Sequence, residues 1–308
     1  MIGPIKLGTK NLLSISDLTN DEINFLIELA HSFKKKESKK FFREKVLGLI
    51  FDKASTRTRV SFQVGMSRLG GSSIDLNPST SQLGRGELIK DTARVLSKYC
   101  DVLAIRTSHH SNIEEYAKWS SKPIINALTD LEHPCQALAD FMTIKEEFGD
   151  IQNKVLAYIG DGNNVAHSLI LGGAILGCEV RIGCPKGYEP NPKIVNKAKQ
   201  IGKSNFSLKV DNNAYATASK ADVIYTDVWA SMGEEEEKDT KEKDFIGYTV
   251  DEKLLSYADK NAIVLHCLPA YRGKEITDEI IESQNCRIFE QAENRMHVQQ
   301  ALLSCLLA

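Results

Sequence analysis

The fold is decided by residues 134–160, which read PCQALADFMTIKEEFGDIQNKVLAYIG. The proline at the start and Gly149 near the middle favour a helix over 134–148, because proline suits a first helical turn and glycine suits a helix end. The short apolar run at 154–160 then predicts a buried β-strand. One domain ends where this helix stops and another begins with the strand, so we place the domain boundary after Gly149.

The same alternation of strand and helix runs outward in both directions. Short aliphatic runs predict strands near 46–51, 73–76, 102–106, 123–128, 154–160, 179–183, 207–211, 222–227, 262–268 and 286–290. Helical periods lie near 56–69, 87–99, 112–119, 164–177, 192–201 and 250–259. This alternation is typical of doubly wound parallel sheets. We expect an α/β protein with two such lobes, 1–149 and 150–308, a cleft between them, and a last helix, about 292–307, that packs back on the first lobe.

The composition is that of an ordinary globular chain. Of the 308 residues, 42% are hydrophobic and 26% are charged, and the formal net charge is −2. This balance gives no general attraction to nucleic acid or to an anionic membrane. Seven cysteines without a Cys-x-x-Cys pair disfavour a zinc finger or a disulfide framework. Neither a signal peptide nor a membrane span is evident, so we expect a cytoplasmic protein.

An acidic segment interrupts the second half. Residues 234–244 contain seven acids and three lysines and no apolar residue. Charge alone favours a solvated loop. The alternative is a mobile lid, because the Ser-Met-Gly sequence at 231–233 provides a glycine hinge.

Polar residues follow several predicted strands, at the sheet edge where open parallel sheets bind ligands. The first group is Ser-Thr-Arg-Thr-Arg at 55–59, at the start of a predicted helix. Hydroxyls, free backbone N–H groups and a guanidinium at a helix N-terminus suit a phosphate. The alternative is an ordinary surface helix cap with solvated arginines.

Two further groups end strands of the first lobe. One apolar strand delivers Arg106 to the same edge, although a lone arginine there is more often structural. A later strand leads to His133 and Gln136 at the start of the helix at 134–148. An imidazole donor can polarise a carbonyl, and glutamine can hold an amide-like group by two hydrogen bonds.

The second lobe opens with Gly-Asp-Gly-Asn-Asn at 160–164, which superficially matches a dinucleotide fingerprint. The match fails because Val165 replaces the third glycine and Cys184 stands where the acidic residue is expected. Asp227 and the His-Cys-Leu-Pro sequence at 266–269 also follow strands. A thiol beside a carboxylate can steer a substrate amine and accept its proton, whereas an isolated Cys267 would be buried and inert.

Six motifs together resemble the aspartate and ornithine carbamoyltransferase family over nearly the whole chain. They are Ser-Thr-Arg-Thr-Arg at 55–59, the strand ending in Arg106, His-Pro-Cys-Gln at 133–136, Gly-Asp-Gly-Asn-Asn at 160–164, Asp-x-Trp-x-Ser-Met-Gly at 227–233 and His-Cys-Leu-Pro at 266–269. The first three resemble the carbamoyl-phosphate site of the family. The last three are similar to those of its ornithine-using branch.

The resemblance implies specific site residues. Those expected to hold carbamoyl phosphate are Ser55, Thr56, Arg57, Thr58, Gln82, Arg106, His133, Gln136, Cys267, Leu268 and Arg295. Those expected to hold ornithine are Asn164, Asp227, Ser231 and Met232. The residues expected to act in catalysis are Arg106, His133, Asp227 and Cys267. Family members with this layout are homotrimers with shared active sites, so Gln82 is expected to act in its own subunit or in a neighbour.

The implied reaction transfers the carbamoyl group of carbamoyl phosphate to the δ-amine of L-ornithine, giving citrulline and phosphate. A neutral amine attacks and phosphate departs, so cations must neutralise growing negative charge, and no metal or organic cofactor is needed. The resemblance places the reaction in arginine metabolism, with the biosynthetic direction favoured. Three alternatives stay open: a sister enzyme acting on putrescine or an acylated ornithine, a phosphate-binding module without activity, and an oxidoreductase.

Overall fold

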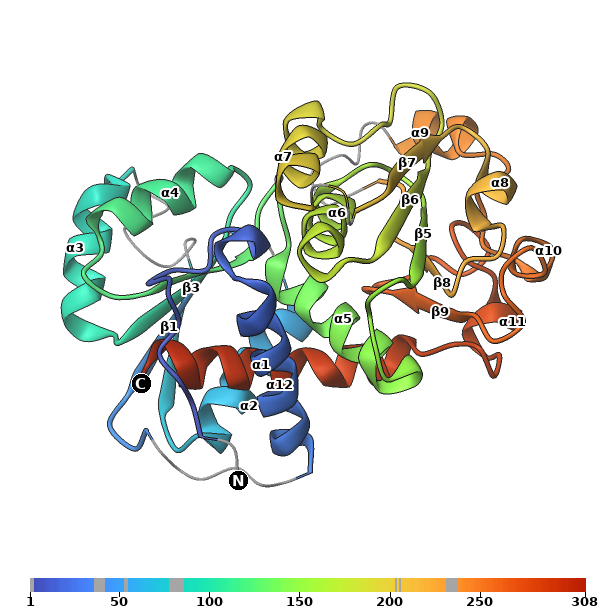
Figure 1. Cartoon of the computed structure of the whole chain (residues 1–308). Helices are drawn as coiled ribbons and strands as arrows, with labels where there is room; N and C mark the ends of the chain where they lie inside the picture. Colours follow the sequence, from blue (N-terminus) through green and yellow to red (C-terminus); the bar gives the residue numbers. More distant parts are fainter. Residues whose placement is uncertain are drawn as a thin grey trace. The chain divides into compact units, whose positions relative to one another are not determined.

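The computed structural model describes residues 3–35, 42–52, 55–77, 86–202, 204, 206–230 and 238–308. The chain forms two compact units (Figure 1). Unit 1 comprises Met1–Ala139 and Glu293–Ala308, and unit 2 comprises Asp140–Ala292. Each unit is built on one parallel β-sheet with helices on both faces, which is the doubly wound α/β class expected from the sequence.

The sheet of unit 1 has four parallel strands in the order β2-β1-β3-β4. The strands are β1 (Val46–Phe51), β2 (Ser72–Leu76), β3 (Val102–Arg106) and β4 (Ile124–Leu128). The helical elements are η1 (Ile15–Asp17), α1 (Asn20–Lys34), α2 (Thr56–Arg68), α3 (Ile89–Tyr99) and α4 (His110–Trp119). The direction of winding reverses between β1 and β3, so the carboxyl ends of these two strands define the ligand-binding edge of this topology.

The sheet of unit 2 has five parallel strands in the order β7-β6-β5-β8-β9. The strands are β5 (Val155–Ile159), β6 (Glu179–Gly183), β7 (Leu208–Asp211), β8 (Val223–Thr226) and β9 (Ile263–His266). The helices are α6 (Asn164–Leu176), α7 (Pro192–Gly202), α8 (Ala214–Ala218), α9 (Lys238–Asp244), α10 (Glu252–Leu255) and α11 (Asp278–Ile281). Here the winding reverses between β5 and β8, which places their carboxyl ends at the corresponding edge.

The inner strands of both sheets are largely buried because helices cover both faces of each sheet, whereas the edge strands β2 and β7 are mostly exposed. Every residue of β3, β8 and β9 is buried. The core of unit 1 includes Ile50, Leu103 and Ile105. In unit 2, Trp229 stacks on Phe245 at a ring distance of 5.5 Å and extends the core beyond the sheet.

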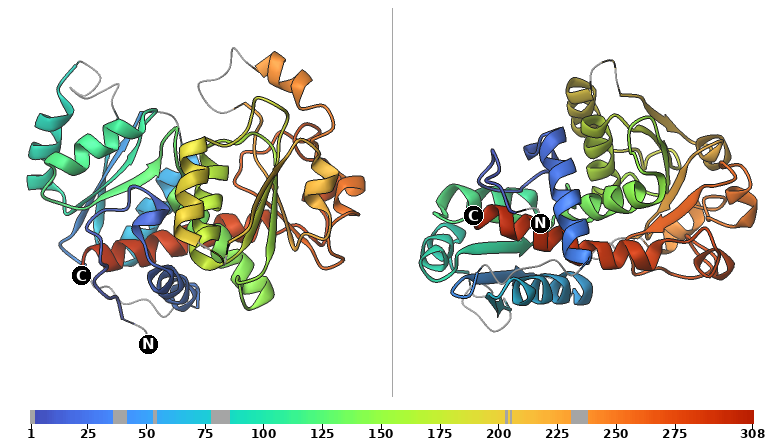
Figure 2. Two further views of the ribbon diagram at one scale, coloured as in Figure 1. Left: turned by 45° about the horizontal axis from the view of Figure 1, so that its top comes forward. Right: turned by 60° about the horizontal axis from the view of Figure 1, so that its bottom comes forward.

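Two long helices carry the chain across the boundaries of the units. These are α5 (Pro134–Phe148), within which the chain leaves unit 1, and α12 (Ile288–Leu306), within which it returns. In unit 1, α12 runs beside α1 and α2 in all three views (Figures 1 and 2). Lys34 Nζ donates to Asn294 Oδ1 at 2.8 Å, which fixes α1 against α12.

Three local expectations are wrong. The strand predicted at 286–290 does not form, because only Cys286 bridges to Val264 and Ile288 already begins α12. The helix predicted at 250–259 is reduced to α10. The acidic segment is not simply a solvated loop, because its second part forms α9, whose Lys241 is buried. Residues 231–237, on which the lid interpretation depends, lie outside the described residues.

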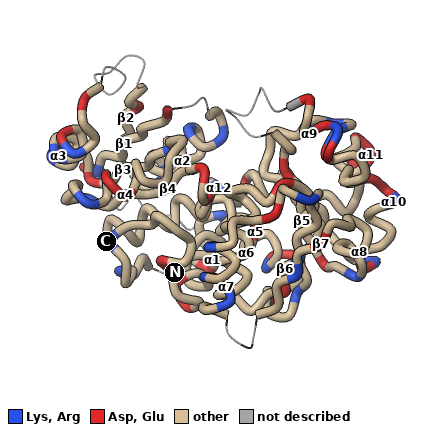
Figure 3. Tube along the Cα trace, turned by 90° about the horizontal axis from the view of Figure 1, so that it is seen from above, with Lys and Arg blue, Asp and Glu red and all other residues tan. Residues whose placement is uncertain are grey.

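Both signs of charge are distributed over the surface. Figure 3 shows Lys and Arg interspersed with Asp and Glu on both units, for example on α3 and α9. Among the described residues, no helix is both long enough and apolar enough to cross a membrane.

Candidate active site

The Ser-Thr-Arg-Thr-Arg motif lies at the start of α2, directly after β1. Ser55 is the N-cap residue in an extended conformation, and its side chain makes no capping hydrogen bond. Thr56 and Arg57 are exposed in the first turn, whereas Thr58 is buried. The first turn of α2 contains no acidic side chain, so its backbone N–H groups and helix dipole favour an anion.

Arg106 lies at the end of β3, next to β1 across the switch point of unit 1. Its side chain is buried, and Nη1 donates to Ser55 Oγ at 3.2 Å. This contact joins Arg106, at the end of β3, to the Ser-Thr-Arg-Thr-Arg motif that follows β1. The two residues were predicted separately, and the sheet topology joins them.

Arg295 is the centre of a second group in unit 1. It lies on α12, and it is buried beside the start of α5. Its guanidinium donates to Gln136 Oε1 at 2.8 Å, to Thr58 Oγ1 at 2.7 Å and to His133 Nε2 at 2.9 Å. These three acceptors belong to two of the predicted motifs. One arginine therefore unites residues that are more than 150 positions away in the sequence.

The contact with Arg295 fixes the protonation of His133. A guanidinium can only donate hydrogen bonds, so His133 Nε2 must be the acceptor, and the proton of the neutral ring lies on Nδ1. Burial, together with the positive charges of Arg295 and Arg106, lowers the pKa of His133 well below its ordinary value. His133 is therefore neutral at physiological pH. In this arrangement its Nε2 is an acceptor, whereas the sequence interpretation used the ring as a donor to a carbonyl.

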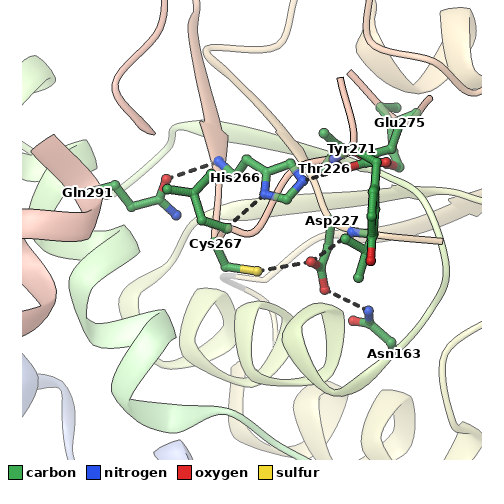
Figure 4. Close-up of polar contacts among 11 residues, drawn as sticks. Asn163, Thr226, Asp227, His266, Cys267, Tyr271, Glu275 and Gln291 are labelled. Atoms are coloured by element: carbon green, nitrogen blue, oxygen red, sulfur yellow. Dashed lines mark hydrogen bonds and ion pairs between the residues drawn. The ribbon is translucent and has the colours of Figure 1, made fainter. Parts of the chain in front are cut away.

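In unit 2 the central side chain is Asp227, which follows β8. Its Oδ1 accepts hydrogen bonds from Cys267 Sγ at 3.0 Å and from Val228 N at 2.8 Å. Its Oδ2 accepts from Asn163 Nδ2 at 2.9 Å (Figure 4). The predicted pair of a thiol and a carboxylate is thus assembled, and an amide from the end of β5 supports it across the switch point.

Asn163 was not predicted as a site residue, although its neighbour Asn164 was. Asn163 is the N-cap of α6, and its Oδ1 accepts from Val165 N and Ala166 N. Tyr158 also donates to this oxygen at 3.2 Å, and burial raises the pKa of Tyr158 well above its ordinary value, so the phenol stays a donor. Asparagine directly before a helix is a strong N-cap signal, and this signal could have identified Asn163 from the sequence. Asn164 is the half-buried first residue of α6.

Behind Cys267 lies a buried pair, His266 and Glu275. Leu268 N donates to His266 Nδ1 at 2.9 Å, so the proton of the neutral ring is on Nε2, which lies 3.1 Å from Glu275 Oε1. Leu268 has φ 58°, a left-handed conformation that costs a non-glycine residue about 1–2 kcal/mol. The hydrogen bond from its N–H to His266 holds this conformation beside the thiol. Neither His266 nor Glu275 was expected from the sequence to have a role in the site.

Asp227, His266 and Cys267 also offer three possible metal-ligand atoms within 4.8 Å of one another. The candidate ligand atoms already take part in hydrogen bonds. Both nitrogens of His266 have partners, and the Cys267 thiol donates to Asp227. A metal ion would have to displace these hydrogen bonds, so the three residues suit a hydrogen-bonded site better than a metal site.

Gly162 explains why the loop after β5 imitates a dinucleotide fingerprint. A Cβ on this residue would lie 2.4 Å from Pro190 N and 2.7 Å from Tyr188 O, so only glycine fits. Gly162 N donates to Tyr188 O at 2.9 Å. The glycine thus serves close packing of two loops, which agrees with the rejection of a nicotinamide site.

Lys241 is a further residue that the sequence did not single out. It lies in α9, and its Nζ is 2.6 Å from Asp161 Oδ2, with the lysine side chain 4% exposed and the aspartate side chain 14% exposed. Asp161 belongs to the same loop as Asn163. A lysine within a run of charges gives no sign of burial, so only the tertiary structure could reveal this ion pair.

Three predicted residues, Gln82, Ser231 and Met232, lie outside the described residues. The remaining predicted residues form two groups, each within one unit. The group in unit 1 comprises Ser55, Thr56, Arg57, Thr58, Arg106, His133, Gln136 and Arg295. The group in unit 2 comprises Asn164, Asp227, Cys267 and Leu268.

Two family models match the chain, and together they span most of it. Residues 10–146 match the model described as aspartate/ornithine carbamoyltransferase, carbamoyl-P binding domain. Residues 152–306 match the model described as aspartate/ornithine carbamoyltransferase, Asp/Orn binding domain.

Full-length relatives and solved structures agree with these matches. The chain is 66% identical over 307 residues to the ornithine carbamoyltransferase of Prochlorococcus marinus subsp. pastoris, and the alignment covers 100% of both chains. The solved structure of the ornithine carbamoyltransferase of Pyrococcus furiosus is similar, with a TM-score of 0.92 and 45% identity over 96% of each chain. The anabolic ornithine carbamoyltransferase of Campylobacter jejuni has a TM-score of 0.92 and 42% identity, over 97% of this chain and 99% of that one.

Proposed function

The chain belongs to the aspartate/ornithine carbamoyltransferase family, and we propose that its two groups of polar residues bind the two substrates of an ornithine carbamoyltransferase. The protein transfers the carbamoyl group of carbamoyl phosphate to the δ-amine of L-ornithine, which yields L-citrulline and phosphate. The observation in the structure that best supports this function is the junction of Arg295 with Thr58, His133 and Gln136. It gathers separate family motifs around one buried cation.

Carbamoyl phosphate is assigned to the first domain, residues 1–149, together with the last helix. The phosphate is placed at the start of α2, where Ser55, Thr56, Arg57 and Thr58 provide hydroxyls, backbone N–H groups and a charge. The carbamoyl group is placed beside Arg106, His133, Gln136 and Arg295, whose side chains are all buried. Buried donors act more strongly on a polar substrate than solvated ones, because the local dielectric is low. Gln82 is assigned to the phosphate as well.

Ornithine is assigned to the second domain, residues 150–308. The carboxylate of Asp227 is suited to the substrate α-amine, with Asn164, Ser231 and Met232 as its neighbours in this role. Cys267 and the backbone of Leu268 are assigned to the reacting amine and the carbamoyl group. The thiol is oriented for this, since it already donates to Asp227 at 3.0 Å.

The reaction needs charge neutralisation, orientation and one deprotonation. Negative charge grows on the leaving phosphate and on the carbonyl oxygen, and Arg57, Arg106 and Arg295 supply fixed positive charge there. Orientation of two substrates removes much of the entropic barrier. The δ-amine has an intrinsic pKa near the lysine value of about 10.4, so its neutral fraction rises with pH. Activity is therefore expected to increase toward alkaline pH, and a flat pH profile would contradict this step.

A homotrimer with shared active sites is proposed from the family resemblance. Unit 1 supports an association surface, because several large apolar side chains on β2, α2 and α3 are exposed. These are Val60, Ile74, Leu88, Val95 and Tyr99. β2 is also an edge strand of its sheet. Sedimentation equilibrium would test the proposal, since a particle of one chain mass would contradict it.

The metabolic setting is proposed to be arginine biosynthesis in the cytoplasm. Support comes from the structurally similar enzyme of Campylobacter jejuni, which is described as an anabolic ornithine carbamoyltransferase. Complementation gives a direct test. The gene should allow a bacterial strain that lacks this activity to grow without arginine, and failure of an expressed, folded protein to do so would count against a biosynthetic role.

The decisive experiment supplies the purified protein with carbamoyl phosphate and one amine at a time. The amines are ornithine, aspartate, putrescine and N-acetylornithine, and the measured products are ureido compound and phosphate. Product from ornithine alone is expected. Product with a different amine only would keep the phosphate assignment and overturn the assignments in unit 2. No product with any amine would favour a phosphate-binding module.

A further inference from the structure

Gln291 connects the end of β9, directly before Cys267, to two other buried groups in unit 2. Its Oε1 accepts a hydrogen bond from His266 N at 3.0 Å, immediately before the thiol (Figure 4). Its Nε2 donates to Asp140 Oδ1 at 2.6 Å and to Tyr225 Oη at 3.2 Å. Gln291 and Asp140 have no exposed surface. A hydrogen bond in a buried setting is electrostatically stronger than one in water, so this contact can hold its geometry tightly.

The four-residue spacing of these side chains along their helices is the same as that of the residues assigned to carbamoyl phosphate. Gln291 and Arg295 lie four residues apart on α12, and Gln136 and Asp140 lie four residues apart on α5. Residues four apart lie on the same face of a helix. Arg295 binds Gln136 and Gln291 binds Asp140, so the two helices are joined by two successive hydrogen bonds, one inside each unit.

We propose that Gln291, held by Asp140, is a positioning residue for the Cys267 thiol and for the turn of α12 that carries Arg295. The inference rests on the proposed function, because that function gives Cys267 and Arg295 their roles. Gln291 touches neither the thiol nor the arginine. It acts through the backbone N–H of His266 on one side and along the helix on the other. The geometry of Cys267 and Asp227 thus depends on a side chain that the family motifs do not include.

The donor and the acceptor of the Gln291–Asp140 hydrogen bond can be exchanged between the two positions, and this exchange provides a specific test. Gln291→Glu keeps an acceptor for His266 N but places a second carboxylate against Asp140. Asp140→Asn retains an acceptor for Gln291 and should be mild by itself. The double variant restores both contacts, because the new amide at 140 donates to the new carboxylate at 291.

The kinetic result follows from the positioning role. Gln291→Glu is expected to lower kcat about tenfold to a hundredfold, since displacement of a reacting group by about 1 Å has effects of this size. The double variant is expected to recover to within about threefold, which makes the two substitutions strongly non-additive. Part of the loss in the single variant should be recovered at lower pH, because one of two adjacent carboxylates then binds a proton.

The rate of alkylation of Cys267 by iodoacetamide provides a readout that does not depend on activity. The rate should rise several-fold in Gln291→Glu, because the thiol moves from the Asp227 carboxylate that disfavours its ionisation, and return in the double variant. Mass spectrometry of the peptides distinguishes Cys267 from Cys286, the other half-buried cysteine, which serves as the internal reference.

Gln299→Leu is the matched control. Gln299 lies on the same helix and is equally buried, but its amide atoms have no hydrogen-bond partner among the residues that the structure describes. This variant should leave both kcat and Cys267 reactivity unchanged. A similar loss in Gln299→Leu, or a folded double variant without recovery, would overturn the proposal. So would unchanged Cys267 reactivity in Gln291→Glu. Absence of citrulline with the unmodified protein would instead reject the proposed function, and the alkylation rates would still test the positioning role.

Discussion

The corresponding edges of the two sheets carry opposite chemistry. In unit 1, the residues around the ends of β1 and β3 include Arg57, Arg106 and Arg295, with neutral acceptors between them. In unit 2, the ends of β5 and β8 meet at a carboxylate, Asp227, which accepts from an amide and a thiol. The same doubly wound topology therefore presents a cationic site in one unit and an anionic site in the other. The cationic site suits a phosphorylated substrate, and the anionic site suits an amine substrate.

The two groups resemble each other in how their central charges are held in place. The guanidinium of Arg295 donates to three acceptors. Asp227 is likewise held by three donors. Each central charge is thus oriented by residues of its own unit, so substitution of one of these charged side chains should leave the other group intact. The first two of the following four predictions test this independence, and the other two test individual charges within each unit.

The largest effect is expected for Arg57→Ala. Loss of a positioned cation at the phosphate should lower kcat/KM for carbamoyl phosphate about 10²–10³-fold. The side chain is exposed, so the unfolding temperature should stay the same. Arg68→Ala, at the other end of the same helix, is the control and should change kcat/KM less than twofold. Marked destabilisation by Arg57→Ala would instead indicate a structural role for this arginine.

Asp227→Asn should have the complementary effect. The variant loses the negative charge opposite the substrate amine, so kcat/KM for ornithine should fall about tenfold to a hundredfold, as expected for a charge-assisted hydrogen bond. Equilibrium binding of carbamoyl phosphate should not change. Asp222→Asn, at the opposite end of β8, is the control for loss of a carboxylate from the same strand. Equal loss for both substrates would remove the distinction between the two groups.

Lys241→Met tests whether the ion pair with Asp161 supports unit 2. The substitution leaves a largely buried carboxylate without its cation, and the free energy of unfolding should fall by about 2 kcal/mol, which is less than for a fully buried pair. Lys241→Met with Asp161→Asn should recover most of this loss. Lys243→Met, on the exposed side of α9, should stay within about 0.5 kcal/mol in urea titrations. Equal effects of the two lysine substitutions would contradict the buried ion pair.

The smallest effect concerns the pH dependence of stability through His133. Its pKa is lowered in the folded state, so the unfolded chain binds a proton first as the pH falls below about 6.5. The stabilisation is complete above that pH and declines below it by at most about 1.4 kcal/mol per pH unit. His133→Gln should remove this slope while keeping an acceptor for Arg295. An unchanged slope in urea titrations from pH 7 to 5 would assign it to other groups.

Much of the fold followed from local patterns. Nine strands of the sequence analysis formed within one or two residues of their expected bounds, because buried parallel strands are short apolar runs between helical periods. The tenth, at 286–290, failed because Ile288 and Phe289 form an apolar run too short to distinguish a strand from a helix start. In the structure this run begins α12, and Phe289 is exposed.

The positions of the site residues could be predicted from the sheet topology, whereas their contacts with one another could not. The rule that ligands bind at the carboxyl ends of parallel strands indicated the positions of Arg106, Asp227 and Cys267. The rule could not single out Asn163, because Asn163 and Asn164 both follow β5, and the hydrogen bond from Asn163 Nδ2 to Asp227 Oδ2 is visible only in the tertiary structure. Nor could it identify Lys241, whose charged neighbours suggested solvent.

The sequence by itself determined the order of the elements, the two-lobed α/β class and the polar residues at the strand ends. These depend on periodicity and on chain direction, which are local properties. Only the tertiary structure decided which of these residues share hydrogen bonds and which neutral groups hold them. Arg295 and Gln136 lie 159 positions apart, and Gln291 and Asp140 lie 151 apart. Such pairs form only after both sheets and the two crossing helices have packed, and no pattern along the chain encodes their partners.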